Sequence, residues 1–327
     1  MDKNYRTAFN SSSFLAKMGR IMQEVDEKSG LLLGKPRIGR FLDVGAAPGG
    51  FSHYFLNSRP GSLGVGINLP RERGGHIFAA SVEESRYQLH HQDLTDGEFF
   101  ARHPLINENP GLFDLVVLDC LYLDNKEWNL PEESEAGMKL TKGKFHENHS
   151  LGEDVLLATQ LFLALHNLSS NGSLIARLTS QGHSKSNLIL MGLRNLFKSV
   201  VVVKPTICHS VRSSCYVVFD GFLVNQNDSD PLYEQFLAMK ERLHAWLVKA
   251  HAFASDLLLD LKEIFLGVNG SLEVVLNDEV ADFIIKTFGT AWRTQLDAIN
   301  GALLRFRERK TYGPPSKFKW NAESNRQ

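Results

Sequence analysis

Short apolar runs alternate with stretches of helical periodicity over residues 40–223. Alternation of this kind predicts an α/β fold with a Rossmann-like, doubly wound and mostly parallel sheet that carries helices on both faces. The last two apolar runs leave no room for a crossover helix between them, so we expect an antiparallel strand at the sheet edge. The expected strands are RFLDVG, SLGVGIN, FDLVVLDC, GSLIARLT, SVVVVK and CYVVFDGF, and the expected helices cover residues 49–58, 152–169 and 183–197.

An amphipathic pattern precedes the first expected strand. Apolar residues recur at helical spacing from Phe14 to Val25, and Lys17 lies at the margin of this stripe. Further along, residues 124–148 are rich in charge and show no periodicity. A loop of this length within a compact domain is typical of a functional lid or of a disordered segment.

The strand–helix alternation stops at the polar stretch NQNDSDP. Beyond it, helical patterns of apolar residues cover 232–247, 252–266 and 279–304. We therefore expect two parts, an α/β domain over residues 1–224 and a helical appendage over residues 225–327. The simplest role for such an appendage is packing or recognition of a partner.

The overall charge of the chain is balanced. Thirty-six basic and thirty-seven acidic residues give a formal net charge of -1, so no global field favours a nucleic acid or a membrane. One local segment is different, because residues 305–320 interleave basic and aromatic side chains. That composition suits contacts with RNA phosphates and bases, or equally a solvated chain end.

Cysteine and histidine usage bears on the compartment and on metal binding. Cys120, Cys208 and Cys215 have neither the number of a disulfide framework nor the spacing of a metal site, and the twelve histidines are scattered. The polar start of the chain lacks the apolar core of a signal peptide, and no apolar run approaches the roughly 20 residues of a membrane span. We therefore expect a soluble intracellular protein without a metal, cytoplasmic by default and with the nucleus also open.

The most specific local pattern is FLDVGAAPGGFSHYFL at residues 41–56. Gly45, Gly49 and Gly50 fall where an expected strand ends and a helix begins, where glycine lets a ligand approach the backbone and helix amides supply donors. The spacing matches neither the dinucleotide G-x-G-x-x-G nor a phosphate-binding P-loop. It fits a nucleoside cofactor without a pyrophosphate; the alternative is a tight turn with glycine for packing.

The string DVGAAPGGFSHYF, with Asp43 at its start, resembles motif I of the FtsJ/RrmJ-type RNA ribose 2'-O-methyltransferases, which bind S-adenosylmethionine (SAM). The resemblance extends over about residues 10–223, through Asp119 and the closing KPTICHSVRSSCYVVFDGF, and does not cover the C-terminal helices. It implies SAM as the cofactor and RNA as the partner.

The resemblance also assigns residues to the cofactor. The turn would line the methionine and ribose parts of SAM, Asn68 would face the ribose at the end of the second strand, and Asp93 would lie near the adenine amino group. Asn68 and Asp93 have the alternative of ordinary turn residues. The implied cofactor residues are Asp43, Gly45, Ala46, Ala47, Pro48, Gly49, Gly50, Phe51, Asn68, Asp93 and Asp119.

A Lys-Asp-Lys-Glu tetrad is implied for catalysis, and the chain departs from it. Lys17 matches the first lysine, with Lys28 as a weaker candidate, and Asp119 matches the aspartate. The second lysine falls on Arg177, which cannot accept a proton but could orient the hydroxyl, stabilise negative charge, bind a phosphate or pair with the aspartate. The glutamate falls on Ser214, so the balancing carboxylate is missing, and we interpret the two departures as linked.

Three functional hypotheses follow from these residues. The first is a SAM-dependent methyltransferase that acts on RNA ribose. The second, motivated by Arg177, Ser214 and Asn68, is a relative that binds SAM or RNA without turnover. The third, motivated by the balanced charge, is a methyltransferase whose acceptor is a small molecule or a protein.

Overall fold

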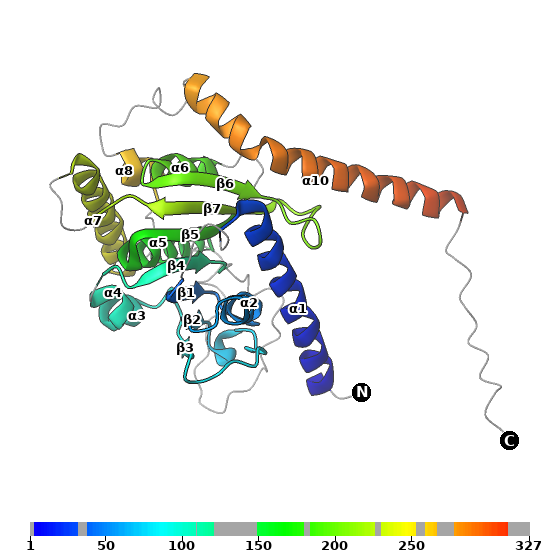
Figure 1. Cartoon of the computed structure of the whole chain (residues 1–327), viewed down its shortest axis with the longest axis horizontal. Helices are drawn as coiled ribbons and strands as arrows, with labels where there is room; N and C mark the ends of the chain where they lie inside the picture. Colours follow the sequence, from blue (N-terminus) through cyan, green and yellow to red (C-terminus); the bar gives the residue numbers. More distant parts are fainter. Residues whose placement is uncertain are drawn as a thin grey trace.

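The computed structural model describes residues 3–31, 38–108, 110–120, 149–179, 184–225, 230–252, 259–266 and 278–312 (Figure 1). The strands are β1 (Arg40–Val44), β2 (Leu63–Asn68), β3 (Tyr87–His91), β4 (Phe113–Leu118), β5 (Leu168–Thr179), β6 (Phe197–Val203) and β7 (Ser214–Phe222). They form one seven-stranded sheet in the order β3-β2-β1-β4-β5-β7-β6.

Strand β1 is central and pairs in parallel with β2 on one side and with β4 on the other. Four of its five residues are buried, because helices cover both faces of the sheet. After β1 the chain adds β2 and β3 on one side of β1, and it then crosses back to place β4 on the other side. The strand order therefore reverses between β1 and β4, and their carboxyl ends flank this topological switch point. Open α/β sheets bind their ligands at such a point.

The edge strand β6 pairs in antiparallel fashion with β7, as the short connection between them predicts. The strand that runs against all the others is β7, which lies one place in from the edge, between β5 and β6. This arrangement brings residues of β7 directly beside the carboxyl end of β5.

Two helices, α1 (Lys3–Ser29) and α2 (Gly50–Ser58), cover one face of the sheet. The apolar stripe predicted before the first strand supplies this packing, since Met18, Ile21, Met22 and Val25 are all buried. They pack with Phe51 and other apolar residues of α2 and of the central strands.

The remaining elements pack on the opposite face or extend the fold. They are the 3-10 turn η1 (Arg71–Arg73) and the helices α3 (Gly97–Arg102), α4 (Pro104–Asn107), α5 (His149–Asn167), α6 (Ser184–Arg194), α7 (Pro231–Ala252), α8 (Leu261–Leu266) and α10 (Asp278–Tyr312). Helices α7 and α8 join the large core formed by β4, β5, α5 and α6, with Leu243, Leu247 and Ile264 all buried there. Helix α10 contacts β6 and then runs out past the sheet (Figure 1).

The expected strands are present, and the expected helices are present where the structure describes them. Strand β3 was not predicted, because YQLHH is short and has no clear alternation. Helix α10 extends to Tyr312, beyond the predicted 279–304. The predicted loop at 124–148 and residues 313–320 of the basic-aromatic segment lie outside the described residues, as do parts of the helical pattern at 252–266. No helix in the described ranges has the length and hydropathy that a bilayer crossing requires.

Candidate active site

The turn after β1 is built on left-handed glycines. Gly45 has φ 92° and Gly49 has φ 99°, a region that glycine occupies without strain. A Cβ on Gly45 would lie 2.8 Å from the Cys120 nitrogen, so the turn lies directly against the end of β4. The amides of Gly45 and Ala46 donate to the carbonyl of Ile67 at 2.9 and 3.0 Å. The predicted cofactor turn is therefore fixed between the ends of β2 and β4.

Helix α1 approaches this turn closely from one side. A Cβ on Gly50 would lie 2.5 Å from the Met18 Cβ and 2.7 Å from the Gly19 nitrogen, so the start of α2 touches the backbone of α1. A small cavity of about 10 Å³ lies between these elements. Its lining residues are Met18, Asp43, Gly45, Ala46, Ala47, Pro48, Gly50, Phe51 and Asp119.

Asp43, in β1, is a buried carboxylate on the wall of this cavity. One of its oxygens lies 2.6 Å from the Ser52 hydroxyl, which lies 2.7 Å from the hydroxyl of Tyr87. The other oxygen, Oδ1, is buried and has no hydrogen-bond partner among the described residues. Burial, together with the charge of Asp119, raises the pKa of Asp43 to about 7, although the Ser52 hydrogen bond opposes the shift.

Asp119 lies directly after β4 and is held by two side chains from neighbouring strands. Arg177 Nη1 lies 3.3 Å from Asp119 Oδ1, and the Tyr216 hydroxyl donates to the same oxygen at 3.3 Å. Arg177 and Tyr216 are directly paired across β5 and β7, which places both side chains on one face. Burial raises the pKa of Asp119 to about 6, because these two contacts offset only part of the cost of desolvation.

Ser214 begins β7, two residues before Tyr216 and opposite Thr179 of β5. Its hydroxyl is buried and has no hydrogen-bond partner among the described side chains and backbone. Its carbonyl accepts a hydrogen bond from the ammonium of Lys204 at 2.7 Å, and this ammonium also donates to the carbonyl of Arg212. Burial lowers the pKa of Lys204. The position where a carboxylate was expected thus lies beside a buried lysine that binds backbone oxygens.

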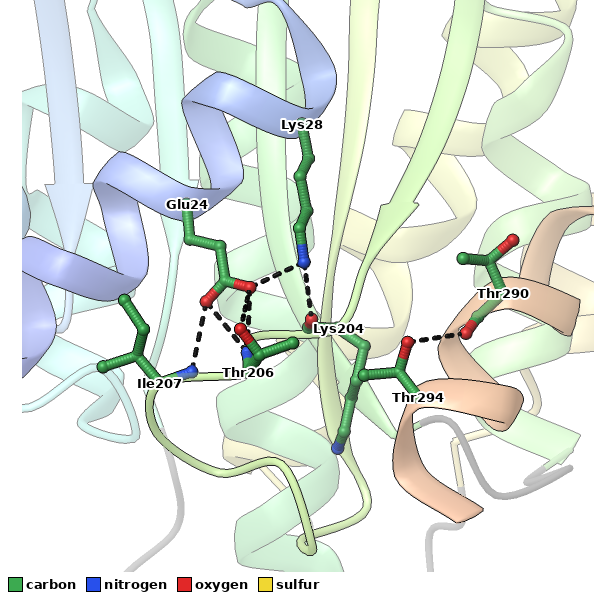
Figure 2. Close-up of polar contacts among 7 residues, drawn as sticks. All are labelled: Glu24, Lys28, Lys204, Thr206, Ile207, Thr290 and Thr294. Atoms are coloured by element: carbon green, nitrogen blue, oxygen red, sulfur yellow. Dashed lines mark hydrogen bonds and ion pairs between the residues drawn. The ribbon is translucent and has the colours of Figure 1, made fainter. Parts of the chain in front are cut away.

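The two lysines considered for the first tetrad position lie on α1 in different surroundings. Lys28 forms an ion pair with Glu24 at 2.6 Å and donates to the carbonyl of Lys204 (Figure 2). Lys17 is exposed and has no ion pair within the described part of the chain. Its charge contributes to lowering the pKa of His209. Lys28 is therefore engaged in a structural contact, and the role of Lys17 stays a prediction.

The predicted nucleoside contacts lie at the carboxyl ends of β2 and β3. Asn68 ends β2, and its side-chain amide donates to the carbonyl of His76 at 2.8 Å. Asp93 pairs with Arg73 at 2.9 Å and accepts hydrogen bonds from the amide and hydroxyl of Thr95. Burial would raise the pKa of Asp93, but these partners hold it below its ordinary value. Both residues have protein partners in this conformation, although carboxylate and amide oxygens can accept further bonds.

The segment after β2 rests on the glycine turn. The amides of Ala79 and Ala80 donate to the carbonyl of Pro48 at 2.9 and 3.2 Å. A Cβ on Gly49 would lie 2.5 Å from the Ala80 Cβ, so no side chain larger than hydrogen fits between them. The segment after β2 therefore packs closely against the glycine turn.

A second cavity of about 400 Å³ lies between α5 and α6, at the carboxyl ends of β4 and β5. Arg177 and Ser214 line it on the side of the tetrad positions. Its other charged lining residues are Arg212, Glu153 and Lys185, and Lys185 is ion-paired with Asp154. Its volume lies within the usual range of small-molecule pockets, about 300–1,000 Å³. It is large enough for an acceptor group next to Arg177.

Sequence analysis did not single out Tyr216 or His209 as site residues. Tyr216 had a usable signal, since residues two apart on a strand share a face and Tyr216 follows Ser214 by two. His209 lies in the irregular loop between β6 and β7, where no periodicity in the sequence indicates which way a side chain points.

The residues around the small cavity fit SAM, which carries a sulfonium and an ammonium. The side chains of Asp43 and Asp119 are both buried, and among the described side chains the one cation in contact with them is Arg177, which pairs with Asp119. The orphan oxygen of Asp43 would gain a partner from a cationic group, and the glycine turn leaves its backbone accessible. Within the described ranges, no group of three His, Cys, Asp or Glu residues is placed to hold a metal ion.

Comparisons with known proteins agree with this chemistry. The sequence profile described as FtsJ-like methyltransferase matches residues 22–222, a range that begins after Lys17. The chain is 29% identical over 199 residues to the ribosomal RNA large subunit methyltransferase E of Zymomonas mobilis, covering 61% of this chain and 75% of that protein.

Solved structures overlap with the chain only in part. A Plasmodium falciparum structure described as a ribosomal RNA methyltransferase is 16% identical with a TM-score of 0.39, covering 62% of this chain and 94% of the other. Human methyltransferase-like protein 13, in complex with SAH, is 14% identical with a TM-score of 0.36, covering 72% and 92%. The assignment depends on the sequence profile, which matches well over half of the residues: the chain belongs to the FtsJ-like methyltransferase family.

Proposed function

We propose that this chain transfers the methyl group of SAM to a ribose 2'-hydroxyl of RNA. The observation that carries the proposal is the position of Asp119, which lines the cavity of the glycine turn and contacts Arg177 at 3.3 Å. Asp119 therefore lines the cavity beside the cofactor turn and, through its contact with Arg177, is also connected to the lining of the larger cavity.

Each residue then has a role that follows from its chemistry. Bound SAM supplies an electrophilic methyl group on a cationic sulfur. Asp43 and Asp119 provide the negative charge that holds such a cation, and Tyr216 keeps Asp119 in place. Arg177 orients the acceptor hydroxyl and stabilises the negative charge that develops on its oxygen. Positioning of this kind supplies much of the rate acceleration in a methyl transfer.

RNA as the acceptor has two supports. The curated relative from Zymomonas mobilis carries a name that specifies ribosomal RNA. In addition, Arg212 lines the larger cavity with Arg177 and Lys185, although Lys185 is ion-paired with Asp154 and Glu153 also lines the cavity. A cationic side chain at this cavity suits contact with an RNA phosphate. We further propose that residues 1–224 carry the reaction and that residues 225–327 form the helical appendage.

The experiment has two stages. Calorimetric titration with SAM tests the cofactor site, and transfer of labelled methyl into total RNA, followed by nucleoside mass spectrometry, tests the reaction. Asp119→Ala should reduce transfer by about 100-fold or more, as expected when a positioned charged group at a reacting centre is lost. The control Asp297→Ala changes an exposed residue of α10 and should retain transfer.

The outcomes separate the three hypotheses. Label in 2'-O-methylated nucleosides supports the proposal. Label in protein or in small molecules would assign a different acceptor. Tight SAM binding with no labelled acceptor of any class would identify a non-catalytic relative and contradict the proposal.

A further inference from the structure

Arg177 carries a hydrogen-bond donor that no group in the described ranges accepts. Its Nη1 atom contacts Asp119 at 3.3 Å, whereas its Nε atom is buried and has no hydrogen-bond partner among the described residues. The side chain is 12% exposed, so water has little access to it. A guanidinium is a rigid fork of five donors, and a buried donor without a partner costs free energy. A ligand oxygen at this position would remove that cost.

Ser214 offers a second buried donor on the same face of the sheet. Across the ladder Ser214 is paired with Thr179 and Arg177 with Tyr216, so Arg177 and Ser214 are diagonal neighbours. Residues in that relation lie about 7–8 Å apart. The Ser214 hydroxyl, like the Arg177 Nε, has no partner in the described part of the chain, and both residues line the cavity of about 400 Å³. One cavity is therefore lined by two residues with unsatisfied donors.

The charges closest to Ser214 are positive. The buried ammonium of Lys204 donates to the carbonyl of Ser214 at 2.7 Å and also to that of Arg212. Arg212 is exposed, lines the same cavity and has no ion pair within the described ranges. Asp119 offsets one charge of this group through Arg177. The part of the lining formed by β5, β7 and the loop before β7 therefore has an excess of positive charge.

The helices contribute a different lining to the cavity. Glu153 comes from α5, and Lys185 of α6 is paired with Asp154. An anion is therefore favoured beside β5 and β7 rather than beside α5. The aliphatic lining of the helices suits the uncharged part of a ligand and consists of Leu156, Leu157, Leu161 and Ile189.

We infer that Arg177, Ser214 and Arg212 form a phosphate subsite, which binds the phosphodiester on the 3' side of the acceptor nucleotide. This inference rests on the proposed function and names the group by which the RNA is held. A phosphodiester presents two non-bridging oxygens, which suit a guanidinium and a neighbouring hydroxyl. In RNA the 3' oxygen and the 2'-hydroxyl are attached to adjacent ribose carbons. A 3' phosphate at Arg177 therefore brings the hydroxyl close to Asp119 and the cofactor turn.

The serine at position 214 has a physical reason in this arrangement. A carboxylate there, which the family resemblance implies, would accept from Arg177 itself and repel a phosphate. The serine hydroxyl removes that competing charge and adds a donor. The change to arginine at position 177 follows the same logic, because arginine can hold a phosphate by two parallel donors where lysine offers a point charge.

The first test measures RNA binding without turnover. SAM-saturated protein is titrated into fluorescein-labelled oligouridylate and oligoadenylate of equal length. Ser214→Glu should weaken binding of both by about tenfold or more, because a carboxylate then occupies the subsite, while SAM binding is retained. Ser85→Glu is the matched control, since it adds the same charge at an exposed turn before β3, the edge strand remote from β7, and should leave RNA affinity within about twofold.

Arg212→Gln gives a second variant whose folding is not at risk, because the side chain is exposed. It should weaken binding of both oligonucleotides to a similar extent and lower the slope of log affinity against log salt by about one, as expected when one phosphate contact is lost. Arg40→Gln, at an exposed position where β1 begins, is its control and should keep the slope of the parent.

The second test places the phosphate relative to the methylated ribose. Oligoribonucleotides carry one uncharged methylphosphonate, either 3' or 5' of the nucleotide that the parent protein methylates. The 3' substitution should lower kcat/KM by about tenfold or more, and the 5' substitution should have the smaller effect. In Arg212→Gln the 3' penalty should shrink, because this variant has already lost the contact. A merely structural role of Arg212 would leave the penalty unchanged.

Each result decides the matter. A penalty that is larger on the 5' side, or equally large in the parent and in Arg212→Gln, would overturn the subsite. If the parent protein labels no RNA, the proposed function fails, and the binding test still stands. Unchanged RNA affinity and salt slope in Ser214→Glu and Arg212→Gln, with SAM binding intact, would then contradict the inference separately.

Discussion

At the scale of single residues, the site carries more buried negative charge than the described cations offset. Asp43 and Asp119 both line the small cavity, and Arg177 contacts Asp119 alone. Burial disfavours the ionised carboxylate, and the partners of the two residues offset only part of that cost, which is why their pKa values are raised to about 7 and about 6. A cationic ligand reverses this preference.

SAM binding should therefore depend on pH through Asp43. A bound cation favours the ionised carboxylate, so affinity should fall by about tenfold as the pH is lowered from 8 to 6, which is the span of one titration centred at about 7. Calorimetry at several pH values measures this, and Asp43→Asn should weaken binding and flatten the dependence. Asp93→Asn is the matched control, because the pKa of Asp93 lies below its ordinary value and its loss should leave the slope unchanged.

The ligand-free protein should respond to pH with the opposite sign. Because the folded-state pKa of Asp43 is raised, its contribution to stability is fully present below the unfolded pKa of about 4 and is lost as the pH rises through about 7. The rise in Tm that SAM produces should accordingly grow from pH 6 to pH 8. An equal rise at both pH values would contradict the assignment of Asp43 to a cationic ligand.

At the scale of elements, the attachment of α1 to the loop between β6 and β7 organises the site. Glu24 is 7% exposed and accepts hydrogen bonds from the amide and hydroxyl of Thr206, which lies on the loop that carries His209. It also accepts a hydrogen bond from Lys28 of α1. Burial alone would raise the pKa of Glu24, but these bonds hold it below its ordinary value. Its contribution to stability is therefore present above the unfolded pKa of about 4.3 and is lost as the pH falls through the folded value.

Glu24→Gln should lower the free energy of unfolding by about 1.5–3 kcal/mol at pH 7, because buried hydrogen bonds to a charged group are lost. It should also reduce methyl transfer, since the loop loses its anchor on α1. Glu27→Gln, on the exposed face of the same helix, is the control and should change stability by no more than about 0.5 kcal/mol. Denaturant unfolding measures both variants, and equal effects would show that the contact contributes nothing.

How far sequence predicts this site differs from element to element. Strands β1, β2 and β4 were predictable because continuous apolar runs identify buried strands, and the glycine turn was predictable from its residues. Strand β3 was not, because YQLHH mixes polar and apolar residues on an edge strand. His209 could not be placed either, since irregular loops take their course from contacts such as that of Glu24, which joins residues 182 positions apart.

At the scale of the whole molecule, the C-terminal helices share the core of the α/β domain. Phe236, Leu243 and Leu247 of α7 are buried in the same cluster as the residues of α5 and β5, and Ile264 of α8 joins them. The second half of α10 is different, because Leu303 and Leu304 are each more than half exposed. Helices α7 and α8 therefore belong to the core of the fold, whereas the second half of α10 extends away from it.

Leu243→Ala should therefore destabilise the entire fold. Leu243 is fully buried, so its truncation should cost about 2–5 kcal/mol, whereas Leu303→Ala at a site 51% exposed should cost no more than about 0.5 kcal/mol. Chemical unfolding followed by tryptophan fluorescence, with SAM added to report on the α/β domain, separates two possibilities. If the core is shared, unfolding occurs in a single transition, its midpoint moves to a lower denaturant concentration in Leu243→Ala, and SAM binding is lost in that same transition. If SAM binding survives beyond a separate early transition, the helices form an independent unit and the shared core does not govern stability.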